Sequence, residues 1–127
     1  MGYHFWKRQL FKYLQRNVMG EIIMKKLVLT GAAGRLGSYL REPLSQMCEE
    51  LISTDLSDNI GSTYKGERYV KADLANFDEV NKIMDGAEMI IHFGALSDED
   101  SFENILNSNI IGSYNVWEAA SRNKVDR

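Results

Sequence analysis

Short apolar runs alternate with longer amphipathic stretches between residues 27 and 123. The runs are bounded by polar residues or glycine, which is typical of strands that are buried on both faces of a parallel sheet. The pattern predicts four strands, at about 27–29, 50–55, 68–71 and 88–93. In the stretches between and after them, apolar residues recur every three or four positions, the period of a helix that packs by one face.

Three amphipathic helices are predicted after the first, third and fourth strands. The first opens within the glycine-rich turn at 30–37, and Pro43 is expected to kink or shorten it. Its apolar face comprises Leu36, Leu40, Leu44 and Met47. The second helix has an apolar face of Phe77, Val80, Ile83 and Met84. The third spans about 101–123, and the residues expected to face the sheet are Ile105, Ile110, Tyr114, Trp117 and Ala120.

Strands that alternate with helices predict an α/β fold, a Rossmann-like three-layer α/β/α arrangement around a parallel sheet with right-handed crossovers. The sequence provides this fold truncated to about its first four strands, which we expect in the order 3-2-1-4. The fourth strand would then be an exposed edge, and the last helix would be partly uncovered. We therefore expect a marginally stable chain that tends to associate edge to edge.

Composition and charge exclude several classes of function. The 127 residues suffice for one domain, and 44% hydrophobic with 26% charged residues is ordinary for a globular protein. The net charge of −3 provides no electrostatic footprint for nucleic acid. No apolar run reaches the roughly 20 residues that a membrane helix needs. We expect neither a nucleic-acid partner nor a membrane partner.

The cysteine and histidine content predicts no metal site. The single cysteine, Cys48, excludes a disulfide framework and suits a reducing cytoplasm, where we expect the protein to reside. Cys48 has no neighbouring base or cation to activate it, so we expect it to be inert. His92 ends an apolar strand, and we expect it to pack in the core rather than to act as a base. No cluster of histidine, cysteine and carboxylate residues has metal-ligand spacing.

Residues 1–23 differ in character from the rest of the chain. They are rich in aromatic residues and carry four basic residues against one acid, Glu21, which gives a net charge of +3. They could form a basic amphipathic helix for a membrane surface or a partner, a transit peptide, or an N-terminal extension or translated leader outside the working protein. Met24, an alternative start directly before the first strand, favours the last interpretation. We therefore place the domain at 24–127.

Gly31, Gly34 and Gly37 lie three residues apart, directly after a predicted strand and at the opening of a helix. In this context the spacing is typical of a dinucleotide-binding turn. The first glycine allows a tight turn, and the second lets a pyrophosphate approach the backbone. The helix N-terminus supplies free N–H groups and a partial positive charge. The alternative is a tight strand-to-helix turn without a ligand.

Asp55 ends the second predicted strand, 24 residues after Gly31. That spacing is close to the offset of roughly 20 residues expected for an acid that accepts both ribose hydroxyls. A carboxylate there would repel a 2′-phosphate, so the predicted cofactor is NAD rather than NADP. Arg35 argues mildly the other way, because a guanidinium inside the turn could meet that phosphate. The alternative for Asp55 is a solvated strand end.

Several motifs together resemble one family: the glycine turn at 30–37, the strand end at 55–57, and the segments 72–74, 92–95 and 101–112. They are similar to those of the extended short-chain dehydrogenases/reductases, the NAD-dependent epimerase/dehydratase family, and within it most closely to the uronate dehydrogenases. The resemblance covers about residues 24–127. It implies the NAD-binding portion of an enzyme that oxidises C1 of a hexuronic acid, a small-molecule sugar acid, to a lactone.

The resemblance also implies roles for individual residues. Arg35 and Leu36 would lie along the pyrophosphate, Asp73 would accept a hydrogen bond from the adenine amino group, and Asn109 would brace the strand ends. Ser97 would lie near the substrate hydroxyls. The cofactor-binding residues implied are Gly31, Gly34, Arg35, Leu36, Gly37, Asp55, Leu56, Ser57, Asp73, Leu74, Gly94 and Ala95. The alternative for Asp73 and Asn109 is a capping or turn role.

The family's catalytic pair, a tyrosine base and a lysine four residues later, would lie beyond a fifth strand. The only Tyr-x-x-x-Lys here joins Tyr3 to Lys7, before the first strand, and we reject it. No catalytic residue is therefore predicted in this chain, and we expect it to be inactive alone. The alternatives are a fragment of a sugar-nucleotide epimerase or dehydratase and a non-catalytic dinucleotide-binding or sensing protein. Whether the full-length protein forms a homo-oligomer stays open.

Overall fold

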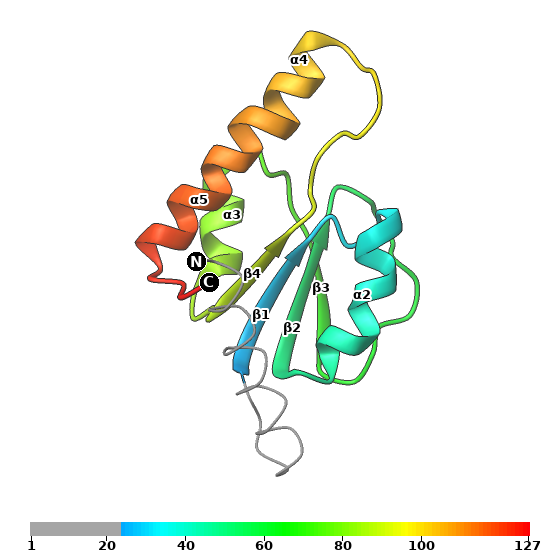
Figure 1. The fold of residues 1–127 in the computed structure, drawn as a ribbon, viewed down its shortest axis with the longest axis vertical. Coiled ribbons are helices and arrows are strands. Elements are labelled where there is room, and N and C mark those ends of the chain that lie inside the picture. The colour runs from blue at the N-terminus through cyan, green and yellow to red at the C-terminus, as the bar shows by residue number, and fades with distance from the viewer. Residues whose placement is uncertain (1–23) are drawn as a thin grey trace, which may run out of the picture.

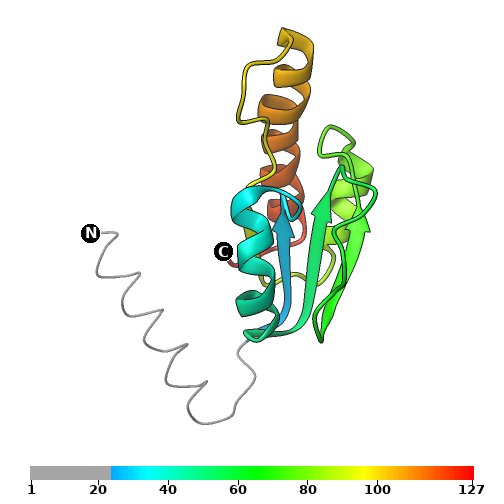
Figure 2. The same ribbon diagram turned by 90° about the vertical axis from the view of Figure 1, so that its right-hand side faces the viewer.

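The computed structural model describes residues 24–127, so the suggested extension at 1–23 lies outside the described residues. Four parallel strands form one sheet in the order β3-β2-β1-β4. The strands are β1 (Met24–Thr30), β2 (Cys48–Asp55), β3 (Glu67–Lys71) and β4 (Met89–His92). Helix α2 (Arg35–Ser45) covers one face, while α3 (Phe77–Met84) and α5 (Gly112–Arg122) cover the other (Figures 1 and 2). The predicted Rossmann-like fold and strand order are confirmed.

The central strand β1 is apolar at consecutive positions because both of its faces are covered. Val28 packs with α3 and α5 residues, whereas Leu27 and Leu29 pack with α2 residues. All three side chains are fully buried, and burial of each contributes roughly 1.5–3 kcal/mol to stability. Strands β1 and β2 start earlier than predicted, since Met24 pairs with Cys48 and both pack against the α2 side of the sheet.

Helix α2 presents a different face to the sheet from the one predicted. Leu36, expected on the apolar face, is 62% exposed, and Gly37 is buried in its place. A Cβ on Gly37 would lie only 2.0 Å from the Gly31 carbonyl oxygen, so the helix packs against the turn at a residue without a side chain. Arg41 is also buried. As expected, the helix is short: it ends at Ser45, before Met47.

The last helix is continuous but contains a π-helical segment, so that α4 (Phe102–Ile105) leads through η1 (Leu106–Ile111) into α5. The predicted sheet-facing residues are wrong here: Ile110, Tyr114 and Trp117 are 58%, 64% and 74% exposed. The buried α5 residues are Gly112, Asn115, Val116 and Ala119. A π turn inserts an extra residue and shifts the helical phase, which a regular 3.6-residue period does not anticipate.

Strand β4 forms one edge of the sheet, as predicted, and all four of its residues are half-buried. The C-terminal tail already pairs with the beginning of this edge. The Asp126 N–H donates to the Glu88 carbonyl at 3.1 Å, and the Ile90 N–H donates to the Arg127 carbonyl at 2.7 Å. The tail therefore covers part of an edge that the sequence suggested would be fully open.

Candidate functional site

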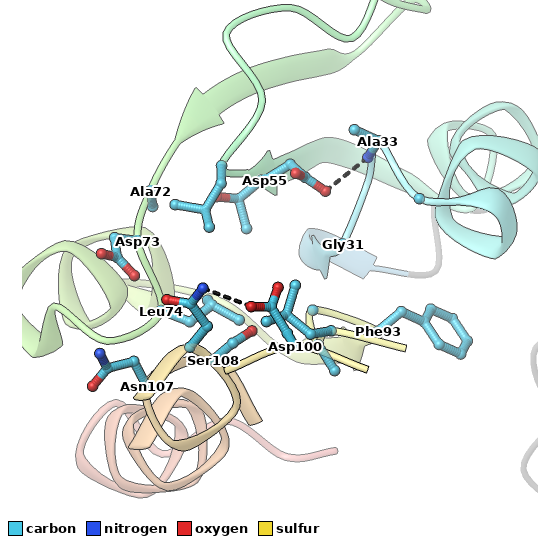
Figure 3. Close-up of a pocket in the computed structure, with 17 residues that line it drawn as sticks. Gly31, Ala33, Asp55, Ala72, Asp73, Leu74, Phe93, Asp100, Asn107 and Ser108 are labelled. Carbon is cyan, nitrogen blue, oxygen red and sulfur yellow. Dashed lines mark hydrogen bonds between the residues drawn. The ribbon is translucent and has the colours of Figure 1, made fainter. Parts of the chain in front are cut away.

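A cleft of about 670 Å³ opens at the carboxyl ends of the strands (Figure 3). Its walls come from the turn after β1, the ends of β2 and β3, the loop after β4, and one side of α4 and η1. Ligands of open parallel sheets bind at this edge. The predicted cofactor residues that line the cleft are Gly31, Gly34, Asp55, Leu56, Asp73, Leu74, Gly94 and Ala95.

The turn after β1 needs glycine for two separate reasons. Gly31 has a φ of +70°, a left-handed conformation that L side chains rarely adopt. A Cβ on Gly31 would also lie 2.6 Å from the Phe93 carbonyl carbon and 2.8 Å from the Gly94 nitrogen. The Gly34 N–H donates to the Gly31 carbonyl at 3.0 Å and so closes the turn. The turn is therefore packed directly on the loop after β4.

Helix α2 begins at this turn with its N-terminus uncapped. Gly34 is the N-cap residue, so no side chain accepts from the first N–H groups, and the first turn holds no acidic residue. Helix α3, in contrast, has Asn76 accepting from the Asp78 and Glu79 N–H groups. The partial positive charge and free donors of α2 are therefore available to an anion in the cleft.

Asp55 connects the end of β2 to the glycine turn. Its Oδ2 accepts from the Ala33 N–H at 3.0 Å, and its Oδ1 accepts from the Ser57 N–H at 3.2 Å. An ionised carboxylate has about four acceptor positions, so capacity is left for hydroxyl groups. Ser57 itself does not line the cleft, and its hydroxyl donates to the Asn59 carbonyl.

Asp73 and Leu74 form the wall after β3. Asp73 Oδ1 accepts from the Ala75 N–H at 2.9 Å, which is the turn role considered as its alternative, although the residue also lines the cleft. The Leu74 carbonyl accepts from Asn115 Nδ2 at 2.8 Å, which ties this wall to α5. The two roles of Asp73 are compatible, because one carboxylate oxygen makes no hydrogen bond within the described residues.

Five predicted site residues lie outside the lining of the cleft: Arg35, Leu36, Gly37, Ser57 and Ser97. Gly37 provides the close contact between helix and turn, and Ser97 is exposed in the loop after β4. Asn109 was expected to brace the strand ends, and it braces this loop instead: its Oδ1 accepts from the Leu96 N–H at 2.7 Å, and its Nδ2 donates to the Leu96 carbonyl at 2.9 Å.

The sequence missed one wall of the cleft, which α4, η1 and Asp100 in the preceding loop provide. Its members are Asp100, Asn104, Asn107 and Ser108 (Figure 3). Hydrogen bonds from Asn104 and from the Ser101 N–H hold the pKa of Asp100 below its ordinary value. Other missed lining residues are Ala33, Thr54, Ala72, Phe93 and Leu96. No sequence signal for η1 existed, because a π turn has no residue signature as clear as that of a glycine turn.

Thr54, on the floor of the cleft, has an unusual hydroxyl. The residue is 1% exposed, and among the described residues its Oγ1 has no hydrogen-bond partner. Leaving a buried hydroxyl unpaired costs about 1–3 kcal/mol. A polar group that entered the cleft could remove this penalty.

The other candidate groups behave as ordinary structural residues. Burial raises the pKa of the Cys48 thiol to about 11, and its Sγ donates to the Leu44 carbonyl, so the thiol is unreactive. His92 is half-buried between Thr30 and Ser113, and burial lowers its pKa. Within residues 24–127, no group of three or more His, Cys, Asp and Glu residues is placed to hold a metal ion. No helix in the same range is long and apolar enough to span a bilayer.

A parallel sheet with a glycine turn, an uncapped helix N-terminus and an acid at the next strand end defines the dinucleotide-binding class of Rossmann folds. The model of the NAD dependent epimerase/dehydratase family matches residues 27–127, and the chain belongs to that family. NAD is the cofactor of this family.

Relatives and solved structures agree with this assignment. The chain is 42% identical over 102 residues to a uronate dehydrogenase of Pseudomonas putida, covering 80% of this chain and 38% of that protein. It is 46% identical over 97 residues to the uronate dehydrogenase of Agrobacterium fabrum, covering 76% and 36%. A crystal structure of a mutant uronate dehydrogenase from Agrobacterium tumefaciens, complexed with NAD, is 44% identical with a TM-score of 0.74, covering 80% and 38%.

Proposed function

We propose that this chain is the NAD-binding portion of a uronate dehydrogenase, an enzyme that oxidises the C1 hydroxyl of a hexuronic acid to a lactone. The observation that carries the proposal is the 40–46% identity to three uronate dehydrogenases over about four-fifths of the chain. The chain spans 36–38% of the length of those relatives. Cofactor binding is therefore proposed for this chain, and the sugar-acid reaction for the whole protein, which we place in the cytoplasm.

The cleft fits a dinucleotide on independent observations. The left-handed turn at Gly31 and the uncapped start of α2 offer backbone donors to a pyrophosphate. Asp55 retains acceptor capacity for ribose hydroxyls, and the buried Thr54 hydroxyl lacks a partner among the described residues. The Thr54 hydroxyl is buried, so leaving it unpaired without a ligand is costly.

The individual placements proposed here are those that the resemblance to the family implies. The pyrophosphate would lie against Gly34, with Arg35 and Leu36 alongside it, and the adenosine ribose would lie at Asp55, near Leu56 and Ser57. The adenine would meet Asp73 and Leu74. Gly94 and Ala95 would lie under the bridging region of the cofactor, because their small size allows close approach of the backbone. Ser97 would reach the substrate hydroxyls from the loop after β4.

When bound, NAD accepts the hydride that leaves C1 of the sugar acid. The residues of this chain would hold and orient the cofactor, and none of those in the cleft is placed as a tuned general base. General base catalysis contributes about 10²–10⁴-fold to a rate. We therefore expect the isolated chain to bind NAD without turning over a uronate.

Calorimetric titration of the chain with NAD and NADP tests the proposal. We expect NAD to bind more tightly, because the Asp55 carboxylate repels a 2′-phosphate. Asp55→Asn should weaken NAD binding by roughly 10–100-fold, the loss expected for hydrogen bonds to a charged group, and should reduce the preference over NADP. Asp58→Asn is the matched control, since Asp58 is exposed and does not line the cleft. Equal affinities for NAD and NADP in the unchanged chain would refute the assigned role of Asp55.

A further inference from the structure

The hydroxyl of Thr30, at the end of β1, has three close nitrogen neighbours. Its Oγ1 lies 2.6 Å from His92 Nδ1, 3.1 Å from the Phe93 backbone nitrogen and 3.0 Å from the Gly94 backbone nitrogen. All three partners belong to the end of β4 and the loop that follows it. Thr30 is completely buried, so water does not compete for these hydrogen bonds.

The geometry assigns the protons in this cluster. A hydroxyl has two acceptor positions and one hydrogen to donate. The backbone N–H groups of Phe93 and Gly94 can only donate, and both are directed at Thr30 Oγ1, with the Phe93 N–H shared between Oγ1 and the Thr30 carbonyl at 3.2 Å. We assign the hydroxyl hydrogen to His92 Nδ1, 2.6 Å away, which is then unprotonated. The ring proton of neutral His92 is therefore on Nε2, which lies 3.3 Å from Ser113 Oγ on α5.

The same backbone segment supports the glycine turn. Gly31 is so close to the Phe93–Gly94 peptide that a Cβ on it would lie 2.7 Å from the Phe93 carbonyl oxygen. On the other side, a Cβ on Gly94 would lie 3.2 Å from Thr30 Oγ1. The Phe93–Gly94 peptide is thus held between Thr30 and the turn, and a shift of this peptide has to move the turn.

We propose that His92 is a positioning residue for nucleotide binding. In its neutral form, with the proton on Nε2, it accepts the Thr30 hydroxyl hydrogen and so leaves Thr30 free to hold the Phe93 and Gly94 N–H groups. That arrangement keeps the glycine turn in the shape that binds the pyrophosphate. The link to NAD rests on the proposed function, whereas the link between His92 and the loop does not.

The surroundings of His92 favour this neutral form. The facing residues of β1 and α5 are uncharged: Thr30, Ser113, Val116 and Trp117. His92, Val116 and Trp117 line a hollow beside the β4 edge, and the C-terminal tail adds two opposite charges, Asp126 and Arg127, to its lining. Burial is the cause that lowers the pKa of His92 below its ordinary 6.5.

Protonation of His92 would place two hydrogens between Nδ1 and Thr30 Oγ1. Thr30 Oγ1 would then have to accept from the ring, and it would lose either the Gly94 N–H or its share of the Phe93 N–H, which would be left to the Thr30 carbonyl. Because the folded-state pKa is lowered, the stabilisation is complete above the unfolded value of 6.5 and is lost as the pH falls from there toward the lowered pKa. NAD affinity should fall over the acid range in which the folded protein itself takes up the proton.

Nitrogen-15 NMR of the nucleotide-free chain tests the assignment without any reference to NAD. At about pH 7.5, where an ordinary histidine is neutral, we expect His92 to carry its proton on Nε2. On acidification, the Phe93 and Gly94 amide signals should shift with the same midpoint as the His92 ring. A ring proton on Nδ1, or loop amides that do not follow the ring, would overturn the proposal.

Variants connect the assignment to binding. His92→Asn keeps an acceptor near the Nδ1 position, so it should bind NAD like the unchanged chain at neutral pH and should lose the decline at acid pH. His92→Leu removes the acceptor and should weaken binding about tenfold, the loss of one buried hydrogen bond. His4→Asn, which removes the other histidine, should still show the decline of NAD affinity at acid pH. Equal binding by His92→Leu and His92→Asn would contradict the proposal, whereas a failure of the unchanged chain to bind NAD would count against the proposed function alone.

Discussion

Asp55 and Ala33 are joined by a hydrogen bond of 3.0 Å between the carboxylate Oδ2 and the backbone N–H. The bond connects the end of β2 to the glycine turn after β1, two segments that are 22 residues apart in the sequence. It fixes the acid beside the start of α2, so the ribose and pyrophosphate parts of the proposed dinucleotide site are positioned together. A change at Asp55 or at Ala33 should therefore affect both the end of β2 and the glycine turn.

Gly31→Ala should destabilise the chain more than the same substitution at another glycine with a left-handed φ, Gly61. Both Gly31 and Gly61 have a left-handed φ, but a Cβ on Gly31 would clash with Phe93 and Gly94, whereas a Cβ on Gly61 would meet nothing within 4 Å. Gly61→Ala should cost about 1–2 kcal/mol of backbone strain, and Gly31→Ala roughly 1–3 kcal/mol more from overpacking. Denaturant unfolding measures both, and equal costs would show that the turn does not rest on the loop after β4.

The buried ion pair between Arg41 and Glu67 should be important for stability. Glu67 Oε1 accepts from Arg41 Nε at 2.7 Å and from Ser53 Oγ at 2.6 Å, and the Glu67 side chain is fully buried. Arg41→Met would leave an unpaired buried carboxylate and should cost about 3–5 kcal/mol in unfolding free energy. Arg68→Met, which breaks an exposed pair with Glu50, should cost less than about 1 kcal/mol. Similar losses in the two variants would contradict this account.

The same pair predicts a pH dependence of stability. Burial acts to raise the pKa of Glu67, but hydrogen bonds from Arg41, Ser53 and the Tyr64 N–H outweigh it and hold the pKa below its ordinary 4.5. The stabilisation is therefore complete above 4.5 and is lost as the pH falls through the lowered value. Unfolding free energies measured across the acid range should show this loss in the unchanged chain. In Glu67→Gln, the unfolding free energy should depend less steeply on pH, because the contribution of the Glu67 carboxylate is absent. An unaltered pH dependence would refute the role given to Glu67.

The exposed apolar residues of α5 should promote self-association. Tyr114 and Trp117 are exposed, and Trp117 lines the hollow beside the β4 edge. Trp117→Lys should raise the monomer fraction in sedimentation experiments at high protein concentration, because a charge opposes burial of this surface. Tyr39→Lys is the matched control, since Tyr39 is 76% exposed on α2. A monomeric unchanged chain, or an equal effect of both substitutions, would contradict the expectation.

Local rules predicted the strands, the glycine turn and the position of Asp55, whereas the strand order came from the general topology of dinucleotide-binding folds. Each of the three local features depends on residues close in sequence: an apolar run, a glycine spacing and an acid at a strand end. The packing of the last helix could not be predicted, because the π turn at 106–111 interrupts the regular helical period, and because Tyr114 and Trp117 are apolar yet exposed, with Trp117 beside the β4 edge. The cleft wall formed by Asn107 and Ser108 was missed because of the same π turn.

Burial of polar side chains in α2 was equally hidden in the sequence. Arg41 is buried because Glu67, 26 residues away, accepts from it, and because the Ile60 and Ser62 carbonyls accept its remaining donors. Leu36 is exposed because Gly37 occupies the contact with the turn. Both outcomes depend on contacts between distant segments, which a hydrophobic period does not contain.

The central claim is that the cleft at the carboxyl ends of the strands binds NAD. Titration of the nitrogen-15-labelled chain with NAD, followed by amide chemical shifts, tests it most directly. We predict saturable shifts at Ala33, Gly34 and Gly94, with much smaller shifts at Ala120 and Ser121 beside the other hollow. An absence of saturable shifts, or shifts concentrated at Ala120 and Ser121, would contradict the account.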